Sequence, residues 1–179
     1  LLMAIYERWN EVKVSDAAKR IGVSTKSASR CFDELEYLNI DVLGMKGKSR
    51  VINIPNDRKQ VWQQIENVLR NPVIRRFVLR EDMKIEKKAG ISALCEYSLL
   101  SDNVYPTYAV TKRELKASGV KVEKQVSELE EIGCVVLELG YFIDFLGKGF
   151  QDPLSVVLSL TGEEQEEERV DISINEMLE

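Results

Sequence analysis

The first 55 residues show three helical patterns of apolar side chains, followed by two β-like runs. Residues 1–9 are largely apolar and predict a buried helix, after which residues 12–14 read as a short extended link. Helical spacing then predicts a second helix over residues 15–21 and a third over residues 25–38. Residues 37–55 hold two β-forming runs around a glycine-rich tip, which predicts a β-hairpin closed by a proline.

The joint between the second and third expected helices carries a specific packing pattern. Ser15 is the expected cap of the second helix, and Ser24 or Thr25 that of the third. Gly22 can adopt the left-handed conformation that ends a helix, and the small Ala18 lets two helices approach closely. The apolar residues expected to pack these helices together are Ile21, Val23, Ala28 and Cys31. This spacing is typical of a helix-turn-helix.

The polar side chains left on the third helix and on the hairpin tip are hydroxyls and cations. Such groups bind phosphates and the edges of bases. The residues that we expect to contact DNA are Thr25, Lys26, Ser27, Ser29, Arg30, Lys46, Lys48, Ser49 and Arg50. We assign Ser24 to the helix cap rather than to base recognition.

The hairpin tip also contains Gly47-Lys48-Ser49, which is the ending of a nucleotide-binding P-loop. A P-loop requires another glycine five residues before Gly47, and that position is Val42. It also requires a helix after the serine, where this chain has a β-like run over residues 50–54. The segment therefore predicts a hairpin and not a nucleotide site.

Helix, helix-turn-helix and basic hairpin follow one another in the order of a winged helix. Residues 1–55 resemble the DNA-binding domain of bacterial winged-helix transcriptional regulators, including the MarR-like group. The resemblance implies that segment 24–30 enters a major groove of double-stranded DNA, while the tip 46–50 touches the neighbouring phosphates or minor groove. We also expect a homodimer, because a two-fold operator is read by two helices about one DNA turn apart.

Other uses of a winged helix stay open at this stage. Some winged helices bind only proteins, and RNA is a further alternative. Asp33, Glu34 and Glu36 lie on the later turns of the third helix and are unfavourable close to DNA. They are compatible with DNA binding if only the N-terminal end of that helix enters the groove.

The middle segment, residues 56–88, is expected to link two domains. Asp57 can cap a helix that Asn71-Pro72 terminates. A strand is expected over residues 74–79, within a strongly basic stretch. That stretch fits either a second surface for phosphates or, as we favour, a solvated strand face joined to a charged linker.

Residues 89–179 predict a small acidic domain with mixed helices and strands, which places the whole chain in the α+β class. Expected strands lie around residues 105–110 and 134–146, and expected helices cover residues 92–100, 111–119, 122–132, 153–160 and 170–178. Thr111 and Glu114 have the spacing of a capping box, and Asp152-Pro153 that of a helix start.

Candidate catalytic chemistry is sparse, and we expect no enzyme, no cofactor and no metal. The chain has no histidine, which removes the usual general base and the common zinc ligand. Glu114-Leu115-Lys116 has the carboxylate-x-lysine spacing of some metal-dependent nucleases, but no second carboxylate completes such a site and capping already explains Glu114. Asp144 and Asp152 flank an ordinary glycine loop.

The composition fits a globular protein of one large or two small domains, with 179 residues of which 44% are hydrophobic and 31% charged. The net charge of −5 is unevenly spread. Residues 1–91 carry 18 Lys or Arg and 12 Asp or Glu, whereas residues 92–179 carry 7 and 18. A basic front suggests a polyanionic partner, and an acidic back suggests another task.

The cysteines and the hydropathy indicate a cytoplasmic protein without a membrane partner. Cys31, Cys95 and Cys134 are widely separated and odd in number, so they fit buried thiols of a reducing compartment better than disulfides or a metal site. No apolar run approaches the roughly 20 residues of a membrane span. No secretory signal is visible either.

The second half of the chain has a resemblance of its own. The phrases AGISALCEYSLL, QDPLSVVLSL and EERVDISINEML look like the C-terminal part of bacterial winged-helix proteins that are loosely similar to antitoxins of abortive-infection type IV toxin–antitoxin systems. This resemblance implies autorepression through the first domain and a partner-related role for the second. An antitoxin or protein-interaction module that uses its acidic domain is therefore the alternative function.

Overall fold

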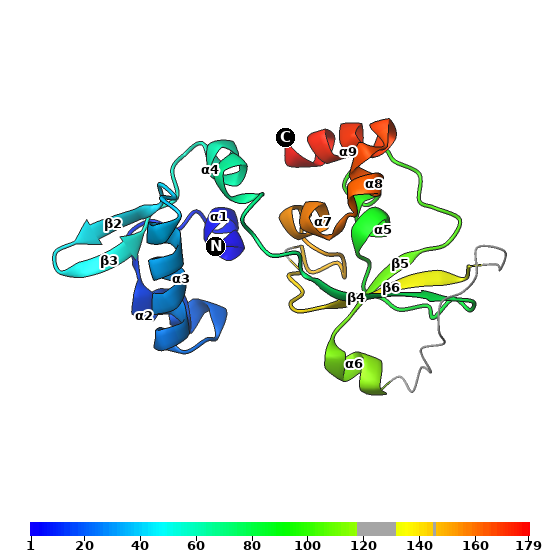
Figure 1. Ribbon diagram of the computed structural model, residues 1–179, viewed down its shortest axis with the longest axis horizontal. Helices are drawn as coiled ribbons and strands as arrows, with labels where there is room; N and C mark the ends of the chain where they lie inside the picture. Colours follow the sequence, from blue (N-terminus) through cyan, green and yellow to red (C-terminus); the bar gives the residue numbers. More distant parts are fainter. Residues whose placement is uncertain (118–131, 145) are drawn as a thin grey trace. The chain divides into compact units, whose positions relative to one another are not determined.

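The computed structural model describes residues 1–117, 132–144 and 146–179. It divides into two compact units, Leu1–Leu69 and Arg70–Glu179, and each unit contains one small sheet (Figure 1). The described residues form nine helices and two three-stranded sheets. The expected mixed α+β class is confirmed.

The first unit contains an antiparallel sheet and four helices. Its elements are α1 (Leu2–Tyr6), β1 (Val12–Lys13), α2 (Val14–Ile21), α3 (Thr25–Tyr37), β2 (Leu43–Lys46), β3 (Ser49–Ile52) and α4 (Arg58–Ile65). The strands lie in the order β1-β3-β2. Strands β2 and β3 pair from Leu43 with Ile52 to Lys46 with Ser49, and Gly47 turns between them with a φ of 62°. A hairpin is therefore present where the sequence predicts one (Figure 1).

Local side-chain chemistry sets the helix ends around α2 and α3. Gly22 follows α2 in the left-handed conformation with a φ of 70°, as expected. The Ser24 hydroxyl accepts a hydrogen bond from the Ser27 amide at 3.1 Å and caps α3. The cap expected from Ser15 is wrong, because α2 begins at Val14 and Ser15 lies inside the helix.

The buried face of α3 differs from the sequence expectation. Ala28 and Phe32 are buried, one helical turn apart. Ile21 and Val23, by contrast, are 41% and 43% exposed. Adjacent helix positions are turned by about 100°, so burying Phe32 carries the neighbouring Cys31 to the surface. Of the three thiols expected to be buried, Cys134 is buried, Cys95 is half-buried and Cys31 is exposed.

Replacing Ser24 by alanine is expected to destabilise the first unit by about 1 kcal/mol, because the Ser27 amide loses its side-chain acceptor. Trp9 and Trp62 are the two tryptophans of the chain and both are buried in this unit, so their fluorescence during urea unfolding reports on it. Ser24→Asn is the control, since asparagine caps about as well as serine. If Ser24→Ala and Ser24→Asn unfold at the same urea concentration as the parent, the cap contributes nothing.

The second unit packs helices on both faces of a mixed sheet. Its elements are β4 (Val73–Leu79), α5 (Gly90–Leu94), β5 (Thr107–Val110), α6 (Lys112–Ala117), β6 (Cys134–Leu139), α7 (Pro153–Ser159), α8 (Gly162–Glu166) and α9 (Glu168–Leu178). In the order β4-β6-β5, β4 runs antiparallel and β5 parallel to β6. Helices α5, α7, α8 and α9 lie on one side of this sheet and α6 on the other (Figure 1). Leu94, Val156 and Val170 join α5, α7 and α9 in one apolar core.

The two units divide the chain differently from the expected boundaries at residues 1–55, 56–88 and 89–179. Helix α4, expected in the linker, belongs to the first unit, where its Gln64 side chain accepts a 3.4 Å hydrogen bond from the Asp41 amide. The basic strand β4 pairs with β6 and is part of the sheet of the second unit. Segment 56–88 is therefore not a linker, because both of its regular elements are built into the units.

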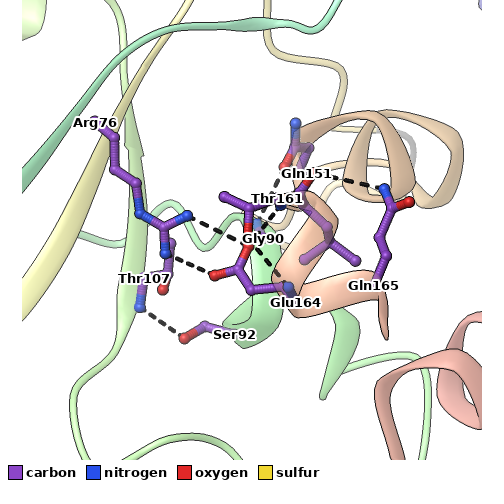
Figure 2. A network of polar contacts seen from close by, with 9 residues as sticks. Arg76, Gly90, Ser92, Thr107, Gln151, Thr161, Glu164 and Gln165 are labelled. Carbon is purple, nitrogen blue, oxygen red and sulfur yellow. Dashed lines mark hydrogen bonds and ion pairs between the residues drawn. The ribbon is translucent and has the colours of Figure 1, made fainter. Parts of the chain in front are cut away.

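A polar network ties the sheet of the second unit to its helices (Figure 2). The Arg76 guanidinium on β4 donates to the Glu164 carboxylate on α8 at 2.6 Å. The Thr107 amide on β5 donates to the Ser92 hydroxyl at 2.7 Å, and the fully buried Gln151 side chain accepts from the first amide of α5 at 3.3 Å. Because the buried polar groups of Ser92, Thr107 and Gln151 are hydrogen-bonded, they stabilise the fold, and the less buried Arg76–Glu164 pair joins the sheet to α8.

Three further expected caps are confirmed outside α2 and α3. They are Asp57 accepting from Gln60 at 3.2 Å, Thr111 accepting from Glu114 at 3.3 Å, and Asp152 accepting from Ser155 at 3.0 Å. The helix expected over residues 92–100 is shorter, since α5 ends at Leu94. The expected end of the helix over residues 111–119 and nearly all of the helix expected over residues 122–132 lie outside the described residues.

Candidate nucleic-acid interface

The N-terminal half of α3 presents polar side chains on the side away from its buried face. Thr25, Lys26, Ser27 and Arg30 are exposed, and Ser29 is half-buried. This distribution follows from the helical repeat, because the residues that pack inside are spaced by four positions and leave the intervening ones in solvent. The first two turns of α3 therefore offer hydroxyls and cations to a ligand.

Three of the cations expected to contact DNA are unpaired. Within the part of the chain that the structure describes, no hydrogen bond or ion pair engages the side chains of Lys26, Arg30 or Lys48. Lys48 is exposed and follows Gly47 at the tip of the hairpin. An unpaired ammonium or guanidinium group can bind a phosphate without first breaking a contact inside the protein.

Arg50 instead joins β3 to α3. Its guanidinium donates to Asp33 at 2.6 Å, to Glu36 at 3.3 Å and to the Ser29 hydroxyl at 3.1 Å. It also lies 5.9 Å from the centroid of the Phe32 ring. The hydrogen bond to Asp33 raises the pKa of Arg50 further above its ordinary value. Arg50 and Ser29 are thus engaged within the unit, and for both the DNA contact stays a prediction.

The contacts of Arg50, which we call the Arg50 clamp, change the charge of the later turns of α3. Of the three acids that disfavour DNA in the sequence, Asp33 and Glu36 both pair with this one guanidinium, which offsets one of their two negative charges. The third, Glu34, is exposed. Sequence reasoning missed this role of Arg50. The signal for it was the spacing of three between the two acids, which places them side by side on one face of a helix.

The remaining expected contacts are partly engaged. The Lys46 ammonium forms an ion pair with the Glu11 carboxylate. The Ser27 hydroxyl lies 2.9 Å from the Ser24 hydroxyl, and Ser49 is half-buried at the start of β3. More than half of the Lys46 and Glu11 side chains is exposed, at 55% and 52%. Because such exposed pairs contribute little stability, Lys46 can exchange Glu11 for a phosphate.

Of the seven basic residues in the stretch 70–88, more than half are engaged within the second unit. Four of them pair with carboxylates of the same unit: Arg75 with Glu138, Arg76 with Glu164, Lys87 with Glu114 and Lys88 with Glu96. The Glu138 side chain is only 2% exposed, so its charge depends on Arg75 for compensation. These pairs favour the structural interpretation of the basic stretch over a second phosphate surface.

Glu114, the carboxylate of the nuclease-like spacing, has a structural partner on each oxygen. The Lys87 ammonium donates to one oxygen at 2.5 Å and the Thr111 amide to the other at 2.7 Å. These donors, Lys87 first, lower the pKa of Glu114 to about 2.

Within residues 1–117, 132–144 and 146–179, no group of three or more His, Cys, Asp or Glu side chains is placed to hold a metal ion. No helix in these ranges has the length and apolar character needed to cross a bilayer.

The candidate interface thus consists of Lys26 and Arg30 on α3 and Lys48 at the hairpin tip, with exposed hydroxyls between them. The Arg50 clamp holds the hairpin against the helix that carries the first two cations. Comparison with known proteins found no family model, no curated protein and no solved structure that matches the chain.

Proposed function

We propose that the protein is a sequence-specific DNA-binding transcriptional regulator whose first unit is a winged helix-turn-helix. The proposal is carried by three exposed cations on two elements that the Arg50 clamp joins, Lys26, Arg30 and Lys48. None of the three has an ion pair or side-chain hydrogen bond to another described residue. Phosphate contacts supply most of the affinity of such proteins for DNA, and each contact requires a cation that is free to make it.

In this proposal the N-terminal half of α3 enters the major groove. Arg30 and Lys26 then reach base edges or the flanking phosphates, and Thr25 and Ser27 supply short hydroxyl groups. Lys48 at the hairpin tip contacts the backbone beside the groove. The C-terminal half of α3 stays outside the groove, where the Arg50 clamp offsets part of the negative charge of Asp33 and Glu36. Two copies reading a two-fold operator complete the proposal.

The direct test is a gel-shift titration of the full chain against DNA from upstream of its own gene, repeated at several salt concentrations. Cation–phosphate contacts release counterions, so the affinity should fall steeply as salt rises, with a logarithmic slope of roughly −0.9 for each phosphate bound. A shuffled fragment of the same length and composition is the control for sequence specificity. Equal affinity for both fragments, or affinity that is insensitive to salt, would reject the proposal.

A protein-interaction role of the second unit, as in an antitoxin, is the second candidate. The favouring observation is the loop between α5 and β5, where Leu99 and Val104 are 95% and 101% exposed. Residues 70–179 also carry 14 Lys or Arg against 21 Asp or Glu, which favours a basic partner. A purified partner that binds the full chain but not a Leu99→Ser/Val104→Ser variant would support this role. A partner that binds both equally would place the contact elsewhere.

A further inference from the structure

A cavity of about 370 Å³ lies on the sheet face of the second unit that α6 partly covers. Eight of its eleven lining residues are apolar, and they come from the sheet, from the segment after β4 and from α6: Phe77, Leu79, Met83, Ile85, Ala109, Val110, Leu115 and Val136. This volume and this apolar character are typical of small-molecule sites. The cavity is part of neither the candidate DNA interface nor the polar network of Figure 2.

The strand pattern explains why this face is apolar and open. Side chains alternate along a strand, so Phe77, Leu79, Val110 and Val136 all point to the face opposite α5, α7 and α9. Helices α5, α7 and α9 pack together on the other face of the sheet. On the cavity face, α6 packs against the sheet through Leu115. Among the described residues, Met83, Ile85 and Leu115 pack over this apolar floor of the sheet.

The cavity lining contains more negatively than positively charged side chains. The Lys87 ammonium is held by Glu114 at 2.5 Å and lies 5.4 Å from the centroid of the Phe142 ring, so it is already compensated. Glu86 also lines the cavity, and within the described residues no hydrogen bond or ion pair engages its carboxylate. The lining thus carries a net negative charge.

We propose that this cavity binds a small apolar molecule that carries one positive charge. Its apolar body lies against Phe77, Val110 and Leu115, and its ammonium group lies at Glu86. The acidic second unit attracts cations to the cavity, and the same field repels anions of equal size. A purely apolar molecule lacks the contact with Glu86. The inference does not depend on the DNA-binding proposal, because none of these residues lies in the first unit.

Isothermal titration of the full chain with phenylbutylamine, phenylbutanol and phenylbutyrate tests the proposal. The three probes share one apolar body and differ in the charge at its end. We expect the amine to bind most tightly, the alcohol less tightly and the carboxylate least. Glu86→Gln should weaken amine binding roughly two- to fivefold, as for an exposed ion pair, and leave alcohol binding unchanged. Glu176→Gln, which removes an exposed carboxylate of α9 away from the cavity, should change neither.

Variants that fill the cavity with a larger side chain test whether the probes bind there and not elsewhere on the protein. Val110→Phe should abolish binding of all three probes, and Leu115→Phe, from the half-exposed surface of α6, should do the same if Val110→Phe does not fold. Equal affinity for amine and carboxylate would overturn the assigned charge. Absence of amine binding to the parent protein, or binding that survives both cavity-filling variants, would overturn the site.

Discussion

Replacing Lys26, Arg30 and Lys48 together by alanine is expected to weaken DNA binding by about 100-fold or more, because each removes one cation that is free to contact a phosphate or base. The slope of affinity against salt should become shallower by about one unit for each lost phosphate contact. The gel-shift titration at several salt concentrations measures both quantities. The expected loss is large because, among the described residues, no hydrogen bond or ion pair has to be broken before these side chains bind.

A control variant with the same change of charge is Lys59→Ala/Lys116→Ala/Lys148→Ala. These three lysines are exposed and lie on α4, on α6 and in the loop before α7, so none of them belongs to α3 or the hairpin. Its affinity and salt slope should stay close to those of the parent protein. Similar losses in the two triple variants would mean that DNA responds to total charge and not to the surface that we describe.

Replacing Arg50 by alanine is expected to weaken DNA binding about tenfold through Asp33 and Glu36, which it would leave uncompensated on α3. The hairpin would also lose its side-chain connection to Ser29. If this explanation holds, adding Asp33→Asn and Glu36→Gln to the Arg50→Ala variant should restore most of the affinity. The same gel-shift titration measures all of these variants.

An Arg50 that touches phosphate would give a different pattern. The Arg50→Ala/Asp33→Asn/Glu36→Gln variant would then keep its low affinity for DNA. The slope of affinity against salt would become shallower by about one unit in the single Arg50→Ala variant. Urea unfolding tests whether Arg50→Ala weakens DNA binding by destabilising the first unit. Because the Asp33 and Glu36 side chains are 60% and 69% exposed, breaking the clamp should cost no more than about 1 kcal/mol in urea unfolding followed by tryptophan fluorescence.

Much of the fold could be predicted because local chemistry decides it. The left-handed Gly22, the caps at Ser24 and Asp57 and the hairpin around Gly47 all depend on residues within a few positions of one another. The burial of Cys31 was predicted wrongly because both it and Phe32 are apolar, and packing of the whole unit chooses which one turns inward. Local pattern alone does not make that choice.

The domain division and the state of the site depended on contacts distant in sequence. The sequence predicts a linker where β4 lies, because the partner strand β6 is some 60 residues further along the chain. Pairing over that distance leaves no local sequence pattern. The exposure of the cations on α3 can be predicted from the helical repeat. The Arg50 clamp cannot, because Arg50 and Asp33 are 17 residues apart in the chain. The sequence predicts which cations face solvent, but not which of them acquire partners.

The central claim is that the N-terminal half of α3 lies in a major groove. A photo-crosslinking residue placed at Thr25, in the full chain bound to the fragment that it shifts, tests this claim most directly, with a matching variant at the exposed Lys59 of α4 as the control. We expect Thr25 to crosslink to bases inside the protected site and Lys59 to give no crosslink. Crosslinks from Lys59 and none from Thr25 would contradict the account.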